Sequence, residues 1–369
     1  MPGGITTEQA IDLGYSTLQA YEPNAVQMAM KKTTYEVVNR WFPKAHKLSG
    51  GKRVDFDLSL GDTGNGMFKK MYQTDTPNVA NVVKEGTVNW VDYQNSFSYA
   101  LQELEVNRDN KTRIFDLLRN RKLNCARETA DELELAGWIT PESATDTDKP
   151  HGIAGWICPG TSDSTGAFSG YLPHYTTSDD SSSTYSTIAG LSCTSAVNNL
   201  YANWYADHNG NLDDSTLKLL RRAFRKTRFQ TPVIADQAID PESDFNNFRL
   251  YTNSKVLDEF EEIATKSDDA IGTDLGKYAG ATTFKKIPFI YIDELDTDRT
   301  YVRGGDPIYG INHNHFYPVV LSGINFEWRK PMNKVGQHDV FTVYLDLRFV
   351  YVCDNRRAGG FLISNFQSP

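Results

Sequence analysis

The sequence lacks the positive charge that a protein coating nucleic acid needs. Its 369 residues carry 38 Lys and Arg against 47 Asp and Glu, so the net charge is −9 with histidine neutral. A broad nucleic-acid surface depends on an excess of Lys and Arg, because these residues neutralise the phosphates. Any contact with DNA or RNA must therefore be local.

Long apolar runs are also missing from the sequence. No stretch approaches the roughly 20 apolar residues of a membrane-spanning helix, and the mean hydropathy is −0.50. The segment that follows Met1 has neither the basic start nor the apolar stretch of a secretory signal. We therefore expect an unprocessed product that is made in the cytoplasm and does not associate with a membrane.

Cysteine is scarce, and the four cysteines lie far apart in the sequence. This spacing excludes a CxxC metal knuckle and a dense disulfide framework. We interpret all four as reduced residues of the core. They are Cys125, Cys158, Cys193 and Cys353.

Recognisable catalytic motifs are absent: GxSxG, HExxH and GxGxxG do not occur in a suitable context. His313 and His315 have a spacing that metal sites use, but a structural pair is the favoured interpretation. The cluster Asp293, Glu294, Asp296 and Asp298 would suit a glycosidase or a cation, although a solvated turn explains it better. We predict no catalytic residue, no cofactor and no metal.

The charges that are present are unevenly distributed. Residues 150–217 contain neither Lys nor Arg, whereas 218–228 hold six of them. Within the first stretch, 159–190 is rich in Ser and Thr and is typical of an exposed loop or insertion. The acidic residues of the first stretch are Asp163, Asp179, Asp180, Asp207, Asp213 and Asp214.

Alternating polar and apolar residues predict strands at 52–60 and 85–101. A segment rich in Gly and Asn separates them, so the simplest arrangement is a long two-stranded hairpin projecting from the body. An isolated pair of strands buries too little apolar surface to be stable. The hairpin therefore needs a neighbour to lie on.

Residues 108–136 predict one long helix that Gly137 terminates. Its N-terminal part is basic and its C-terminal part is acidic, which opposes the helix macrodipole. Opposite charges on a neighbouring molecule would offset that cost, and solvation by water is the alternative. Shorter helices are expected at 213–226 and 254–266, and long strands at 316–328 and 338–353, so the fold class is α+β.

In this order of elements the sequence resembles the major capsid proteins of tailed bacteriophages with the Hong Kong 97 type of fold. KRVDFDLSL, followed by GTVNWVDYQNSFSYALQELEVNRDNKTRIFDLLRNRKLNCARETADELELAGW, is similar to the extended loop and spine helix of that family. FRLYTNSKVLDEFEEI and TTFKKIPFIYIDEL resemble its axial domain, and DVFTVYLDLRFVYVCDNRRAGGFLIS resembles its peripheral strands. The resemblance covers most of residues 45–365 and rests on the order of the elements and on the local residue pattern.

The resemblance implies an N-terminal arm, an extended loop, a spine helix, and peripheral and axial domains. The expected division is an arm at 1–45, an extended β-hairpin loop at 46–106, a peripheral domain at 107–195 that includes the spine helix (108–136) and the insertion (159–190), an axial domain at 196–306, and C-terminal peripheral strands at 307–369.

The resemblance also implies a function. The implied function is that of a structural subunit and not of an enzyme. Copies of this subunit assemble into hexamers and pentamers of an icosahedral shell around double-stranded DNA. The expected partners are copies of the chain, a separate scaffolding protein, a portal protein and a possible decoration protein. The alternatives are an encapsulin-type nanocompartment and a carbohydrate-acting protein that uses the Asp293–Asp298 cluster.

Charged residues of the hairpin, the long helix and the basic helix are the candidates for contacts between subunits. One relative of this family cross-links a loop lysine to a C-terminal asparagine, for which Lys69 or Lys70 with Asn355 are the nearest equivalents, although nothing else marks them. The predicted contact residues are Lys52, Arg53, Asp55, Asp57, Lys69, Lys70, Glu85, Arg119, Arg121, Glu128, Glu132, Arg221, Arg222 and Arg225.

Overall fold

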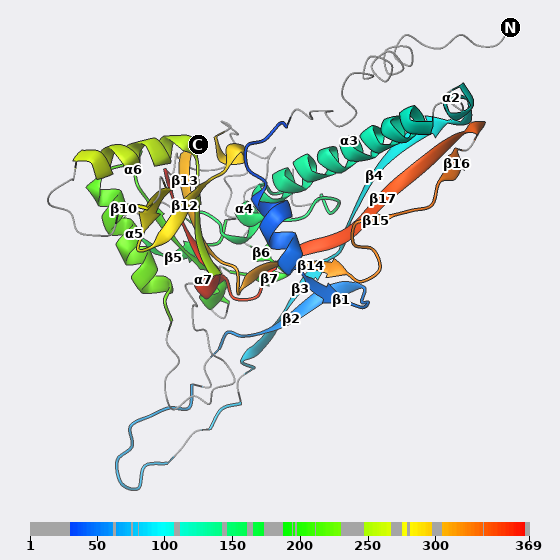
Figure 1. Cartoon of the computed structure of the whole chain (residues 1–369). Helices are drawn as coiled ribbons and strands as arrows, with labels where there is room; N and C mark the ends of the chain where they lie inside the picture. The colour runs from blue at the N-terminus through cyan, green and yellow to red at the C-terminus, as the bar shows by residue number, and fades with distance from the viewer. Residues whose placement is uncertain are drawn as a thin grey trace.

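In the computed structural model the chain forms a compact lobe and a long, thin extension (Figure 1). Two large sheets form the framework, one with eight strands and one with six. The structure describes residues 30–61, 64–74, 77–79, 81–106, 111–141, 146–160, 165–172, 187–193, 195, 198–210, 212–229, 247–266, 275–278, 281–296, 305–334 and 336–365.

The lobe is built on the eight-stranded sheet, against which the two amphipathic helices α5 (Asp214–Thr227) and α6 (Ser254–Lys266) pack. Asp213 begins α5, because its carboxylate accepts the Ser215 N–H at 2.8 Å. In spatial order the strands are β10 (Leu275–Tyr278), β11 (Ala281–Phe284), β12 (Ile287–Tyr291), β9 (Phe248–Thr252), β13 (Gly305–Asn312), β18 (Gly360–Asn365), β8 (Asn203–Asp207) and β5 (Ala167–Gly170).

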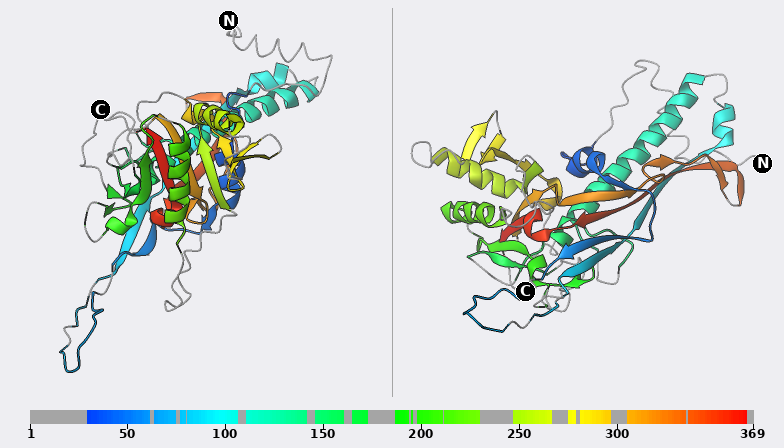
Figure 2. Two further views of the ribbon diagram at one scale, coloured as in Figure 1. Left: turned by 90° about the vertical axis from the view of Figure 1, so that its left-hand side faces the viewer. Right: turned by 90° about the horizontal axis from the view of Figure 1, so that it is seen from below.

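The extension is built on β17 (Gln337–Cys353), which runs through the middle of the six-stranded sheet. The long helix α3 (Lys111–Trp138) lies along this sheet and contacts β4 (Val91–Ala100) (Figure 2). The other strands are β1 (His46–Leu48), β14 (Phe316–Leu321), β15 (Glu327–Trp328) and β16 (Met332–Lys334).

The prediction of one long hairpin is wrong for the second half of its second strand. β2 (Arg53–Ser59) pairs only with β3 (Val83–Asn89), and the chain then leaves the hairpin at Trp90. β4 instead forms ten antiparallel pairs with β17, from Val91–Phe349 to Ala100–Val340. Pairing within a six-stranded sheet buries more apolar surface than pairing in an isolated two-stranded ribbon. This difference explains why β4 pairs with β17.

The long helix ends two residues later than expected, at Trp138, so Gly137 lies inside it. Gly137 is required by a close approach, because a Cβ at this position would lie 2.5 Å from Cγ2 of Val37. Val37 belongs to η1 (Val37–Trp41), a π-helical turn that is continued by η2 (Phe42–Lys44). The remaining elements are α2 (Leu101–Val106), α4 (Ile153–Trp156), α7 (Arg356–Gly359), η3 (Asn199–Tyr201), η5 (Asp293–Leu295) and the hairpin of β6 (Thr187–Ile188) and β7 (Leu191–Ser192).

The eight-stranded sheet continues across the expected domain boundary between residues 306 and 307, and the boundary itself stays a prediction. β13 and β18, which were expected among the peripheral strands, lie side by side in the sheet of the lobe. Most of their residues are buried there, between β9 and β8. Strands on an exposed extension would not be buried to this extent. The chain thus returns to the lobe at its C-terminal end.

The core confirms the interpretation of the cysteines, since all four are buried free thiols. Two large clusters make up this core, one within the lobe and one where the lobe meets the extension. The second is rich in aromatic residues: the Trp41 ring lies 5.1 Å from Trp138 and 5.4 Å from Phe316, centroid to centroid. It joins η1, α3 and β14 into one body.

Most of the Ser/Thr-rich segment lies outside the described residues, as does the arm up to residue 29. The described part of that segment includes β5, which pairs with β8. These four residues belong to the sheet of the lobe instead of an exposed loop.

Candidate intersubunit surfaces

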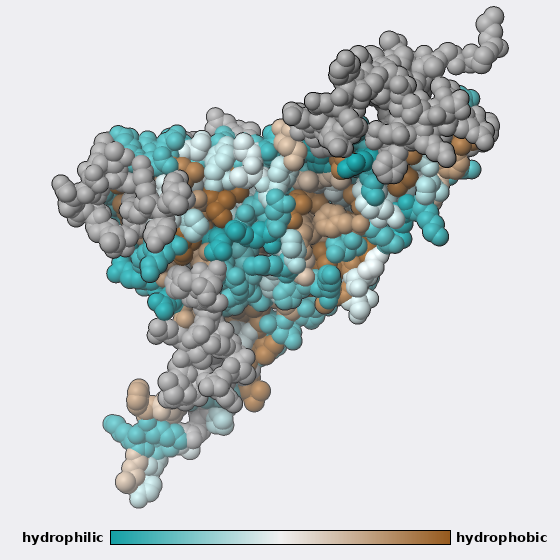
Figure 3. Space-filling view, viewed as in Figure 1, coloured by the Kyte–Doolittle hydropathy of each residue, from teal (hydrophilic) through white to brown (hydrophobic). Residues whose placement is uncertain are grey.

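The loop between β2 and β3 projects from the body and carries large apolar side chains at its tip (Figure 3). Phe68, Tyr72 and Val79 lie almost wholly in solvent, with exposed fractions of 105%, 98% and 99%. Met71 is 84% exposed, and Lys69 and Lys70 lie between these residues. Groups of exposed apolar side chains mark surfaces that bind another molecule.

Short-range hydrogen bonds shape this loop. The side chain of Asn65 donates to Asn78 O at 2.7 Å and accepts the Asn78 N–H at 2.8 Å. Nearer the tip, Lys70 and Gln73 form a turn in which the Gln73 N–H donates to Lys70 O at 3.1 Å. The loop therefore presents its apolar side chains from a closed base.

At the base of the loop, the predicted contact residues of the hairpin share one polar face. Arg53 pairs with Asp55 at 2.7 Å and with Glu85 at 3.5 Å. Asp57 is exposed and stands opposite Glu85 in the register of the strands, and Lys52 is exposed beside the strand. The three carboxylates of Asp55, Asp57 and Glu85 outnumber the two cations Lys52 and Arg53, so this face is acidic.

The basic part of α3 is partly neutralised within the chain. Arg121 donates to Glu103 of α2 at 2.8 Å and to Ser98 O at 3.2 Å, whereas Arg119 is exposed. In the acidic part, Glu128 accepts a weak hydrogen bond from Asn95 at 3.4 Å, and Glu132 is exposed. The structure thus brings Arg121 to a partner in its own chain.

The acidic end of α3 contains the residue that sequence reasoning missed. Glu134 is 1% exposed and accepts the N–H groups of Glu36, Val37 and Val38 at 3.1, 2.9 and 3.4 Å. These donors form the start of η1, so the carboxylate faces the positive end of a helical turn. The charge that opposes the α3 macrodipole thus has its partner in the same chain, about a hundred residues earlier, which no local pattern reveals.

The predicted basic residues of α5 lie on its outer face, away from the sheet. Arg222 donates to Thr165 O, which ties the helix to the start of β5. Arg225 is exposed, and its Nε donates to Arg221 O at 3.3 Å. This cluster stays a candidate contact surface.

The candidate metal and catalytic residues have structural partners. His313 bonds the Tyr251 hydroxyl at 2.7 Å and His315 bonds Asp354 at 2.9 Å, so the two rings serve different contacts. Asp296 accepts the Ser254 N–H at 2.7 Å at the start of α6, and Asp293 accepts the Tyr291 hydroxyl at 3.0 Å. Asp298 lies outside the described residues, among which no group of three or more potential metal ligands occurs.

Asn355, the nearest equivalent of the cross-linking asparagine of that relative, caps α7 by accepting the Ala358 N–H at 3.2 Å. No helix within the described part of the chain is long and apolar enough to cross a membrane.

Comparison with known proteins identifies the fold. No family model and no curated protein matches the chain. Among solved structures, the capsid of cyanophage A-1(L) matches with a TM-score of 0.54 and 11% identity, over 93% of this chain and 95% of that one. The holo-SrpI encapsulin complex from Synechococcus elongatus matches with a TM-score of 0.50 and 9% identity, over 96% and 95% of the two chains. The chain therefore has the fold of phage capsid and encapsulin shell subunits.

Proposed function

We propose that this protein is the major capsid protein of a tailed bacteriophage. In this role it is a structural subunit that forms hexamers and pentamers of an icosahedral shell around double-stranded DNA. The Hong Kong 97-type architecture expected from the sequence is compatible with the observed order of projecting loop, long helix and lobe. A scaffolding protein, a portal protein and a decoration protein are the further proposed partners, and the virion is the proposed location.

The projecting loop tip is the observation that carries this proposal. Burying a Phe or Met side chain contributes about 1.5–3 kcal/mol, and Phe68 and Met71 are still exposed in the single chain. A loop that places such side chains far from its own core is explained by a neighbouring subunit that covers them. Many copies joined in this way would build a closed lattice.

An encapsulin-type nanocompartment is the second candidate, because the encapsulin match covers the chain as completely as the phage match does. The two functions differ in the contents of the shell. The modest negative net charge suits a container that encloses DNA without holding it tightly, and it does not distinguish the two.

Assembly is tested with the purified full chain. We expect capsomers or closed shells in electron micrographs, and we expect the double variant Phe68→Ser/Met71→Ser to reduce their yield at least about tenfold, because two apolar anchors are lost. Both side chains are exposed in the single chain, so its thermal unfolding should not change. Leu200→Ser is the matched control, since Leu200 is a partly exposed apolar residue (39%) in η3, away from the loop.

A chain that remains monomeric with and without scaffolding protein would contradict the proposal. The contents of particles isolated from the source organism then separate the two candidates. DNA protected from nuclease supports the capsid, whereas a co-purifying cargo enzyme without DNA supports the nanocompartment.

A further inference from the structure

Two helices of opposite charge cover one face of the eight-stranded sheet. α5 packs on β18 and β8, and α6 packs on β11, β12 and β13. The buried side chains of both helices belong to one core cluster, which also contains Phe248, Ile308 and Phe361 of the sheet. Both helices lie at the end of the lobe that is farthest from the extension (Figure 1). Their outer faces therefore point away from the sheet, into the solvent around this end.

The outer face of α5 is basic. Leu217, Leu220 and Phe224 are buried, and exposed cations occupy the opposite side of the helix. These cations are Lys218, Arg222, Arg225 and Lys226. Within the described part of the chain none of them has an ion-pair partner, and Arg222 and Arg225 donate only to backbone carbonyls. The residues of α5 together carry a charge of +4.

The outer face of α6 is acidic. Phe260 is buried, and four carboxylates lie on the other sides of the helix. They are Asp258, Glu259, Glu261 and Glu262. Asp258 and Glu259 have neither a hydrogen-bond partner nor an ion-pair partner among the described residues. The cation Lys255 is paired with Asp306 at 2.5 Å. The residues of α6 together carry a charge of −2.

A second copy of this chain matches both helices at once. Like charges on one helix repel one another, so each outer face favours a partner of the opposite sign. Every copy presents both signs, and α5 of one copy therefore attracts α6 of another. Nucleic acid matches this surface less well, because its phosphates are attracted by α5 but repelled by α6.

We propose that α5 of one subunit docks on α6 of the next subunit around a ring. Such a contact uses a different face on each side, so the same rotation repeated from copy to copy closes a ring. The contact lies at the far end of the lobe and leaves the extension and the projecting loop free for other neighbours. This inference rests on the proposed shell function and adds the pair of surfaces that joins neighbours within one ring.

Charge reversal in the full-length protein tests this contact. The α5 variant is Lys218→Glu/Arg225→Glu/Lys226→Glu, which changes the charge of α5 from +4 to −2. The α6 variant is Asp258→Lys/Glu259→Lys/Glu262→Lys, which changes the charge of α6 from −2 to +4. Each variant places like charges on both sides of the contact. At about 0.05 M NaCl, where screening is weak, each should lower the yield of sedimentable particles at least about tenfold.

The combination of all six substitutions in one chain should restore most of the wild-type yield, because α5 and α6 are then complementary again. Rescue by a second helix is not expected of a variant that fails to fold. The matched control is Lys31→Glu/Lys47→Glu/Lys330→Glu, which reverses three exposed lysines outside the two helices. The substitutions of the α6 variant should not reduce any loss that this control causes.

Mixing the two variants separates a contact between subunits from an attraction within one chain. In the mixture, α5 of each variant is complementary to α6 of the other variant but not to its own. We therefore expect rings in which the two variants alternate. Alternation requires an even number of subunits, so native mass spectrometry should detect hexamers with equal numbers of the two variants and no pentamers.

Failure of the shell function and failure of this contact give different results. A wild-type chain that never assembles contradicts the shell function and this contact with it. Wild-type assembly that survives both charge reversals overturns the contact alone, as do losses that neither the combined variant nor the mixture restores. A mixture that stops at dimers would overturn the ring.

Discussion

At the scale of single residues, Arg356 ties α7 to the part of the chain between residues 156 and 203. Its side chain is fully buried and contacts only neutral acceptors among the described residues. It donates to Tyr201 O at 2.9 Å, Gly170 O at 3.0 Å and Asn203 Oδ1 at 2.8 Å, and its Nε donates to Trp156 O at 2.5 Å. One guanidinium thus ties together segments almost two hundred residues apart in sequence.

Replacing Arg356 by Met should lower the free energy of unfolding by about 3–5 kcal/mol, because buried acceptors lose a charged donor. Arg356→Lys should recover only a small part, since an ammonium cannot reproduce the planar fork. Urea unfolding measures both effects. Arg348→Met is the control: Arg348 pairs with Asp92 at a partly exposed site, where about 1 kcal/mol or less is expected. Similar losses for the two Met variants would contradict this role of Arg356.

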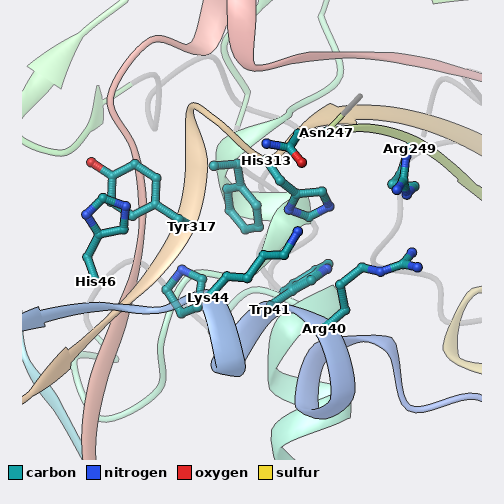
Figure 4. Close-up of a pocket in the computed structure, with 10 residues that line it drawn as sticks. Arg40, Trp41, Lys44, His46, Asn247, Arg249, His313 and Tyr317 are labelled. Carbon is teal, nitrogen blue, oxygen red and sulfur yellow. The ribbon is translucent and has the colours of Figure 1, made fainter. Parts of the chain in front are cut away.

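Two half-buried histidines, of which Figure 4 shows His313, make the protein sensitive to acid. Burial lowers the pKa of His313 to about 3 and that of His151 to about 4. In the unfolded chain both titrate near 6.5, so the unfolded state binds more protons below that pH. Stability is therefore fully present above pH 6.5 and is lost as the pH falls towards the folded pKa values. We expect a loss of about 2 kcal/mol for each histidine between pH 6.5 and pH 5.

Urea unfolding at several pH values measures this loss. His313→Gln should reduce the slope of stability against pH in this range, whatever its effect on stability at pH 7.5. His46→Gln is the control, because His46 is exposed and stacks on Tyr317 at 4.1 Å between ring centroids. A slope that stays the same in His313→Gln would count against this explanation.

At the scale of elements, the contact between α3 and η1 depends on Glu134. Glu134→Gln replaces one accepting oxygen by an NH₂ group that faces backbone N–H donors, so we expect a loss of about 2 kcal/mol. The segment around Lys32 and Arg40 should then become more accessible to trypsin. Glu128→Gln is the control on the same helix, since Glu128 is exposed. Unchanged proteolysis of Glu134→Gln would contradict the role of Glu134.

The elements themselves could largely be predicted from the sequence, but their partners could not. Periodicity indicates α5, α6 and β17 because each buries one face in a regular pattern. The pairing of β4 with β17 joins residues about 250 positions apart, and the strand pattern of residues 85–101 fits a hairpin equally well. The contact of Glu134 with the start of η1 is similarly hidden, because it joins residues about a hundred positions apart in sequence.

At the scale of the whole molecule, two kinds of force should hold subunits together, and salt separates them. The exposed apolar tip depends on burial, which salt does not screen, whereas the acidic face of the hairpin and the basic face of α5 depend on charge. Internal pairs such as Arg121–Glu103 reduce the charge available for contacts between subunits. The salt effect should therefore be partial.

Assembly yield should fall between about 0.05 M and about 0.5 M NaCl, where the screening length becomes shorter than typical distances between surface charges. Arg225→Glu should lower the yield strongly at low salt and weakly at high salt, because screening weakens both the attraction and the new repulsion. Phe68→Ser should lower it by a similar factor at both salt concentrations. Sedimentation of assembled particles measures each yield, and equal wild-type yields at the two concentrations would show that charge contributes nothing to the lattice.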